Sequence, residues 1–308
     1  MAEKVIIWGM GHDFYDIHNL LKLNEECGNI EIVAYVSKDS TLRRFEGREV
    51  ITGEQIENLG GLCFDYIIVA TSKYYKEIAT YGQQVLGIER KKFINGKVLK
   101  IPYFNWKDYL QVYTSHISIV ADWCYGTVLS NILGLQFNSP FVNVRVGYEW
   151  DDYNKLLSNL DYYMSVSPKR QNEGKYIGTN WSGFEGRMEY PKLWYDDIML
   201  HGFHYNNQDE FYRNWEKRRK RYNKHQKLVM QVLYDERDLE MFRNLKFEKK
   251  LGFYGRKVDD DDVILVNLEK VRVYHFAIAV NEYVLNGEIL RDINIFKLLL
   301  GDKNYRES

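Results

Sequence analysis

The chain has 308 residues, a length that suits two domains better than one. Hydrophobic residues make up 45% and charged residues 28%, which is typical of a globular protein, and the net charge of −1 gives no general attraction to nucleic acid or acidic membranes. No uncharged apolar stretch approaches the roughly 20 residues of a membrane helix, and three cysteines without regular spacing fit a reducing compartment. We therefore expect a cytoplasmic protein with no membrane span and no nucleic-acid partner.

The first hundred residues alternate short apolar runs with amphipathic segments. The sequence predicts strands at 4–8, 31–36, 48–51, 64–70 and 92–95, and helices after Gly11 and at 54–59 and 75–86. Continuous apolar strands that alternate with helices indicate a parallel sheet covered on both faces. We expect an α/β protein whose residues 1–103 form a Rossmann-like domain, because the pattern changes around Ile101-Pro102.

Residues 104–308 predict a second, less regular α/β domain. Expected strands are 116–121, 142–146, 196–201, 228–233, 263–266 and 272–280, and expected helices are 127–135, 152–164, 208–222, 235–244 and 287–300. Residues 165–190, rich in Ser, Gly, Asn and Lys, are expected to form a long loop. The closing helix suits packing on its own domain or on a second copy, so a homodimer stays open.

A glycine pair follows the first predicted strand. Gly9 and Gly11 fill the first two places of G-x-G-x-x-G, and such a turn lets a phosphate approach the backbone and the helix N-terminus. Phe14 fills the third place, which argues against an ordinary NAD site. Asp39, after the second strand, stands where an acidic residue meets ribose hydroxyls. The turn predicts a nucleotide or nucleotide-sugar ligand; the alternative is a Rossmann domain that binds nothing.

The loop Asp122-Trp-Cys-Tyr-Gly126 is the most suggestive feature of the second region. It follows a predicted strand and precedes a helix, where open α/β sheets place ligands. Asp122 is a candidate base or sugar-hydroxyl acceptor, and Trp123 a stacking wall. Cys124 is a candidate nucleophile if a histidine lies nearby and its pKa is lowered; otherwise it is a small buried side chain.

Two histidines follow a predicted strand at Leu200. His201 and His204 are candidates for general acid–base work, with a satisfied histidine at a strand end as the alternative. Their spacing lacks the i,i+4 pattern of a helical metal site, so no metal is expected.

Five consecutive cations, Lys217 to Arg221, lie on a predicted helix. They point around most of the helix, so they cannot all serve one site. One interpretation is a solvated helix end; the other is that one or two of Arg218, Arg219 and Arg221 clamp a diphosphate, with Arg218 and Arg221 preferred, because a guanidinium binds phosphate oxygens in pairs.

The N-terminal region resembles a known domain. Gly9-Met-Gly-His12, Val50-Ile51 and the segment from Asp65 to Thr71 are similar to the nucleotide-sugar-binding domain of bacterial sugar acyltransferases. The resemblance implies that Gly9, Gly11 and His12 contact a nucleotide-sugar. No hexapeptide repeat follows, so the acyltransferase half is absent.

Residues 116–265 resemble a bacterial family of unknown function labelled exopolysaccharide biosynthesis. The matching pieces are 119–126, 135–141, 153–163, 190–191, 196–205 and 215–223. The resemblance implies a place in surface-glycan assembly.

Three functions remain as hypotheses. The first is a glycosyl or related transferase that uses a nucleotide-sugar donor and a glycan acceptor, in which Asp122, His201 or His204 activates the acceptor hydroxyl and basic residues stabilise the departing diphosphate. The second is a non-catalytic protein that binds or senses a nucleotide-sugar. The third is a hydrolase or acyl transferase using Cys124 and a histidine.

Overall fold

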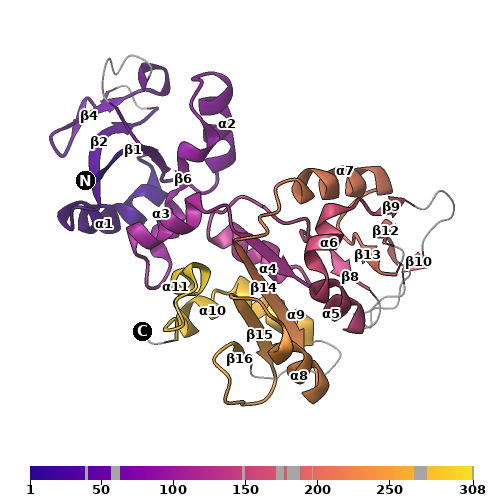
Figure 1. The fold of residues 1–308 in the computed structure, drawn as a ribbon. Coiled ribbons are helices and arrows are strands. Elements are labelled where there is room, and N and C mark those ends of the chain that lie inside the picture. The colour runs from indigo at the N-terminus through magenta and orange to yellow at the C-terminus, as the bar shows by residue number, and fades with distance from the viewer. Residues whose placement is uncertain are drawn as a thin grey trace. The chain divides into compact units, whose positions relative to one another are not determined.

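The computed structural model divides into two compact units, Met1–Tyr109 and Leu110–Ser308 (Figure 1). The structure describes residues 1–38, 41–56, 63–147, 150–170, 177–178, 188–195, 197–266 and 276–306. The boundary expected after residue 103 lies in the segment just before helix α3 (Trp106–Thr114), which runs across the division.

The first unit is built on a six-stranded sheet with the order β3-β4-β2-β1-β5-β6. Its strands are β1 (Glu3–Trp8), β2 (Ile30–Val36), β3 (Arg44–Phe45), β4 (Arg48–Ile51), β5 (Tyr66–Val69) and β6 (Phe93–Asn95). All neighbours are parallel except the β3–β4 hairpin. Chain order reverses between β1 and β5, which is the arrangement of a Rossmann half and confirms the predicted α/β class.

The helices of the first unit bury one face each against this sheet. They are α1 (His12–Glu26) and α2 (Tyr75–Gln84), with short 3₁₀ helices η1 (Gly53–Ile56), η2 (Arg90–Lys92) and η3 (Gly96–Lys100). Helix α1 buries Phe14, Ile17 and Leu21, which recur at helical spacing. The ring of Phe14 lies edge-on to Tyr35 and Phe45, so the third place of the glycine motif holds a core residue.

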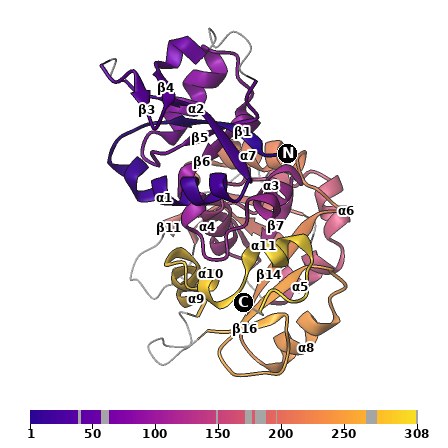
Figure 2. The same cartoon turned by 90° about the vertical axis from the view of Figure 1, so that its left-hand side faces the viewer.

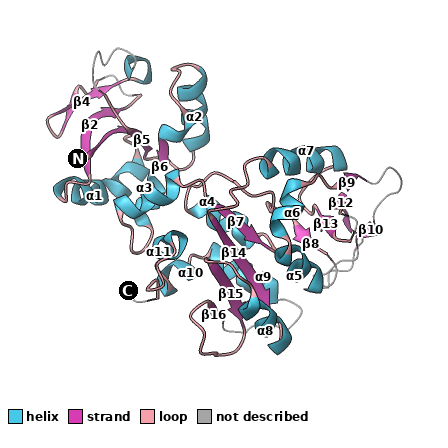
Figure 3. Ribbon diagram, viewed as in Figure 1, coloured by secondary structure: helices cyan, strands magenta, loops and turns pink. Residues whose placement is uncertain are grey.

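The second unit contains a four-stranded parallel sheet with the order β16-β15-β14-β7 (Figure 3). Its strands are β7 (Ser118–Ala121), β14 (Lys227–Leu233), β15 (Lys250–Tyr254) and β16 (Val263–Leu265). Helices α4 (Tyr125–Ile132), α8 (Glu236–Asn244) and α9 (Phe276–Leu285) pack on or beside this sheet, and α4 contacts α9. The closing helices are α10 (Ile289–Asp292), which contacts α9, and α11 (Ile295–Leu300) (Figure 2).

A long insertion between β7 and β14 carries a second, antiparallel sheet with the order β8-β13-β12-β9. Its strands are β8 (Arg145–Val146), β9 (Lys169–Arg170), β12 (Lys192–Trp194) and β13 (Met199–His201), and a separate hairpin joins β10 (Ile177–Gly178) to β11 (Met188–Glu189). Helices α5 (Trp150–Ser158), α6 (Leu160–Ser165) and α7 (Gln208–Arg219) complete the insertion. Its core includes Leu156, Leu193, Leu200 and Trp215.

Several predicted elements differ from the structure. Residues 276–280, expected in a strand, belong to helix α9, while 272–275 lie outside the described residues. The expected helix 152–164 is two helices that meet at Asn159, and 287–300 is divided before Asn294, which caps α11. Strand β15 has no counterpart among the predicted strands. Among the described residues, no helix has both the length and the apolar character needed to span a bilayer.

Candidate functional site

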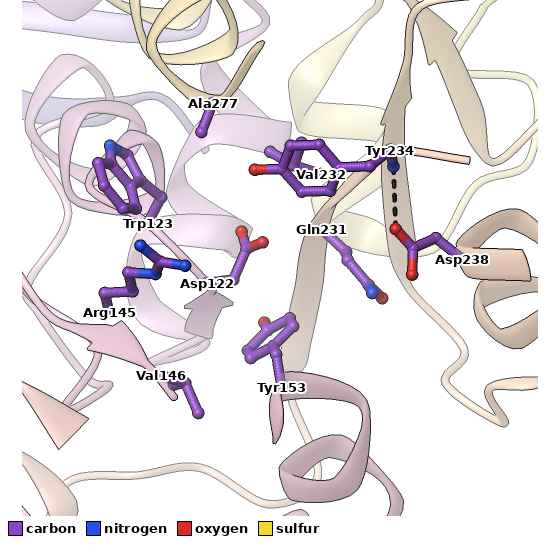
Figure 4. A pocket seen from close by; sticks show the side chains of 10 residues that line it. All are labelled: Asp122, Trp123, Arg145, Val146, Tyr153, Gln231, Val232, Tyr234, Asp238 and Ala277. Carbon is purple, nitrogen blue, oxygen red and sulfur yellow. Dashed lines mark hydrogen bonds between the residues drawn. The ribbon is translucent and has the colours of Figure 1, made fainter. Parts of the chain in front are cut away.

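A pocket opens at the carboxyl ends of β7 and β14 in the second unit. The lining residues are Asp122, Trp123, Arg145, Val146, Tyr153, Gln231, Val232, Tyr234, Asp238 and Ala277 (Figure 4). The pocket has a cavity volume of about 20 Å³ and opens into a wider space of about 380 Å³ that includes solvent. In this conformation the pocket therefore admits one small polar group.

Asp122 occupies the centre of this pocket. It follows the last residue of β7, and α4 begins three residues later, so it stands at the edge where parallel α/β sheets bind ligands. Burial raises the pKa of its carboxyl from 3.8 to about 7, and hydrogen bonds from the Tyr125 hydroxyl and the Val232 backbone only partly offset this rise. A carboxyl with this pKa exchanges protons at neutral pH.

Arg145 brings a cation to the same pocket. It lies on β8, is 4% exposed, and its guanidinium carbon stands 5.5 Å from the centre of the Trp123 ring. In Figure 4 its guanidinium lies between Trp123 and the Asp122 carboxyl. The charge of Arg145 also lowers the pKa of Asp122, but less than burial raises it. A fixed guanidinium beside a proton-exchanging carboxyl suits a substrate that carries an anionic group.

The remaining polar groups of the pocket come from β14 and the helices next to it. The Tyr153 hydroxyl donates to the Met230 carbonyl at 3.1 Å, and the Tyr234 backbone N–H donates to Asp238 at 3.0 Å. The Gln231 amide nitrogen donates to Asn154 at 2.8 Å, whereas its buried oxygen has no hydrogen-bond partner among the described residues. That oxygen is a buried acceptor whose hydrogen-bonding capacity is not used by the described residues.

Cys124 has a histidine beside it. Its sulfur lies 3.7 Å from Nε2 of His204, which satisfies one of the two conditions for a nucleophile. The second condition is not met, because burial raises the pKa of the Cys124 thiol to about 11. The contact is that of a neutral thiol with an imidazole.

His201 is part of the antiparallel sheet. It is 1% exposed, pairs across the strands with Arg145, and its Nδ1 lies 3.2 Å from the Tyr190 hydroxyl. Burial, together with the charges of Arg145 and Lys192, lowers the pKa of His201 to about 3. The imidazole is therefore neutral at physiological pH and a poor base, which leaves Asp122 as the better acid–base group.

The predicted arginine clamp lies elsewhere in the second unit. Arg218 donates to the Tyr205 hydroxyl at 2.5 Å, and Tyr205 in turn donates to the Val142 carbonyl at 2.8 Å. Arg221 lines a different hollow, near the amino ends of the parallel strands. Neither arginine is among the residues that line the Asp122 pocket.

The glycine turn belongs to the first unit. Gly9 has a φ of +102°, and Gly11 is the N-cap of α1 with no heavy atom within 4 Å of the place its Cβ would take. His12 is exposed in the first turn of α1. The expected ribose contact, Asp39, lies outside the described residues.

Comparison with known proteins decides the family. The profile of a domain of unknown function (DUF1919) matches residues 95–277, which is more than half of the chain. The chain belongs to this family. A profile described as C2185-like, N-terminal matches residues 1–94. An uncharacterized protein of Haemophilus influenzae is 26% identical over 140 residues, which cover 44% of this chain and 61% of the relative, less than two thirds of its length.

These matches correct the resemblances drawn from the sequence. The N-terminal part matches a C2185-like domain rather than the nucleotide-sugar-binding domain of sugar acyltransferases. The larger part matches a domain of unknown function, and nothing in these matches indicates exopolysaccharide biosynthesis. Both resemblances were wrong, because short strand–turn–helix segments recur in many unrelated α/β proteins.

Proposed function

We propose that the Asp122 pocket is the active site of a group-transfer enzyme that acts on a donor with an anionic leaving group, such as a nucleotide-sugar. The observation that carries this proposal is a carboxyl with a pKa of about 7, beside a buried arginine, at the carboxyl end of a parallel strand. Perturbed pKa values of this kind concentrate at functional sites.

Each group has a defined part in the reaction. The oxygen of an acceptor hydroxyl attacks the sugar carbon that bears the diphosphate, its proton passes to Asp122, and the bond to the diphosphate breaks. Arg145 binds the oxygens of the departing anion, since a guanidinium donates two parallel hydrogen bonds. The free oxygen of Gln231 accepts a hydrogen bond from the acceptor. In the present conformation the pocket admits one small polar group, so its lining side chains must move apart before the acceptor hydroxyl and the departing anion enter together, and the rest of the substrate lies outside it.

The experiment that tests this proposal measures the release of nucleoside diphosphate from a panel of nucleotide-sugars by the full chain, with water or simple sugars as acceptors. We expect Asp122→Asn to lower the rate by about 10²–10⁴, the usual contribution of a general base. Asp259→Asn, the same chemical change at an exposed loop position, serves as the control and leaves the rate unchanged.

The pH dependence gives a second readout. Because Asp122 acts in its ionised form, kcat/KM rises with pH and levels off above about 7. If nucleotide-sugars bind but no diphosphate is released, the protein is a binding protein and not a transferase. Equal rates for Asp122→Asn and the native chain remove Asp122 from the mechanism.

The 3.7 Å contact between Cys124 and His204 favours a second candidate, acyl transfer through a cysteine nucleophile. The raised pKa of the thiol weighs against it, because the thiolate is the reactive form. The alkylation rate of Cys124 separates the two candidates.

A further inference from the structure

A second hollow lies at the opposite edge of the parallel sheet from Asp122. Its walls include His116, which precedes β7, and Asn223, Lys224 and His225, which precede β14. Arg221 also lines this hollow, and the space measures about 910 Å³, including open solvent. Because the strands are parallel, their amino ends meet at this hollow while their carboxyl ends meet at Asp122.

Hydrogen bonds hold the segments on either side of this hollow together. The Ser118 hydroxyl donates to the Asn138 carbonyl at 2.6 Å and accepts from the Asn223 backbone N–H at 2.8 Å. The Asn223 amide donates to the Ser115 carbonyl at 3.1 Å, and its oxygen accepts from the His225 backbone at 3.0 Å. These bonds fix the loops that carry the cationic side chains before any ligand binds.

Arg221 is the unusual group in the hollow. Its Nε is shielded from solvent and has no hydrogen-bond partner among the described residues. Burial and the nearby charge of Arg218 both lower the pKa of Arg221, and no carboxylate is among the groups that act on it. A buried charged donor without a partner destabilises the fold, and an anion that reaches it would remove that cost.

The carboxylate of Asp161, next to the lining residue Tyr222, already has hydrogen-bond partners. Asp161 accepts hydrogen bonds from the Tyr222 hydroxyl and the Lys227 ammonium, both at 3.0 Å. These bonds, helped by the charge of Lys224, lower the pKa of Asp161 although burial opposes them. The positive charge of Arg221 therefore lacks a carboxylate partner within the described part of the chain.

We propose that this hollow binds a small phosphorylated ligand, with phosphate oxygens held by Arg221 and Lys224. A guanidinium and an ammonium that line the same hollow match the charge of a phosphate or diphosphate group. The chain has a net charge of −1, which favours a small anion over a nucleic acid backbone. The site is separate from the Asp122 pocket and does not depend on the transfer reaction.

Calorimetric titration of the full chain with inorganic pyrophosphate tests this site. We expect Arg221→Gln to weaken binding about tenfold or more, since a charge-assisted hydrogen bond contributes about 1.5–3 kcal/mol. Lys224→Gln, at an exposed position, is expected to weaken binding about threefold without affecting folding. Arg213→Gln, an exposed change on α7, is the matched control and leaves the affinity unchanged.

The side-chain Nε–Hε resonance of Arg221 locates the ligand. It is identified by its loss in Arg221→Gln, and it is expected to shift as pyrophosphate is added. Absence of binding, or equal affinity in Arg221→Gln and the native chain, overturns the proposal. Weakening by Arg145→Gln but not by Arg221→Gln also overturns it, because pyrophosphate would then occupy the Asp122 pocket.

Discussion

The two units begin in the same way, yet they offer a ligand different groups. Each places a strand, a tight turn and a helix at the start of a parallel sheet: β1 with α1 in the first unit, and β7 with α4 in the second. The first turn is Gly9-Met-Gly11, and the second is Asp122-Trp-Cys124. The first offers bare backbone N–H groups, whereas the second offers a carboxyl, a ring and a thiol.

The buried polar side chains follow the same division. Among the described residues of the first unit, Asn95 is the one buried polar side chain, and it caps η3 by accepting from the Lys97 backbone. The second unit buries Arg145, which lines the Asp122 pocket, and His201, which pairs with Arg145 across the strands. The turn geometry of an α/β sheet therefore supplies a place for a ligand, while reaction chemistry depends on charged groups that the fold keeps from water.

The cysteines allow the largest test of this comparison. Cys27 and Cys63, in the first unit, are exposed, while burial raises the pKa of Cys124 in the second unit to about 11. We expect iodoacetamide at neutral pH to modify Cys124 about a hundredfold more slowly than the two exposed thiols, because only the thiolate reacts. Mass spectrometry of timed samples measures the three rates. Fast modification of Cys124 would favour the acyl-transfer candidate over Asp122.

The next largest effect is expected in the free energy of unfolding of Asp122→Asn. The pKa of Asp122 is raised on folding, so the folded chain binds a proton more tightly than the unfolded chain between about pH 4 and 7. The free energy of unfolding therefore falls as the pH rises through this range and stays low above it. Asparagine keeps the acceptor for Tyr125 and carries no charge, so it avoids this loss.

We expect Asp122→Asn to be more stable than the native chain by roughly 1–3 kcal/mol at pH 8, and equally stable below pH 4. Chemical denaturation at the two pH values measures the difference, with Asp259→Asn as the control. If Asp122→Asn is less stable than the native chain at pH 8, the Asp122 carboxylate stabilises the fold. Asp122 would then not be a functional group that the chain retains although it lowers the free energy of unfolding.

The sequence predicted most of the first unit, although not β3, and the position of Asp122. Continuous apolar strands such as 64–70 predicted β5, and the rule that ligands bind at carboxyl ends of strands selected the loop after β7. The same rule, applied to the predicted strand 228–233, would also have found Tyr234. Arg145 is a charged residue inside the apolar predicted strand 142–146, and this placement indicated a functional side chain. The sequence pattern did not indicate that Arg145 lies near Asp122.

The errors have physical causes that lie in long-range packing. Strand β15 escapes prediction because it starts with Lys250, whose ammonium is buried and donates to the carbonyls of Phe242 and Arg243 at the end of α8, each at 2.9 Å. Gly252, in the middle of this strand, leaves room for Leu233, which would lie 2.8 Å from an added Cβ. The run that begins at Phe276 resembles a strand because α9, in contact with α4 and β14, is apolar on most sides.

The two glycines of the first turn give the smallest effect and the sharpest test of that unit. Gly9 has a φ of +102°, so we expect Gly9→Ala to cost about 1–2 kcal/mol, measured by chemical denaturation. Gly11 has extended backbone and open space at its Cβ position, so Gly11→Ala is expected to cost less, about 0.5–1 kcal/mol, because alanine is a poorer N-cap than glycine.

If the turn binds a phosphate, a side chain at residue 11 occupies the space through which that phosphate approaches. Gly11→Val should then reduce the rise in melting temperature that nucleotide-sugars produce, leaving only the part that comes from the Asp122 pocket, and each variant is compared with and without ligand because valine is a poor N-cap. An undiminished response in Gly11→Val would place the ligand away from this turn, and the first unit would then be a Rossmann-like domain whose glycines serve the backbone alone.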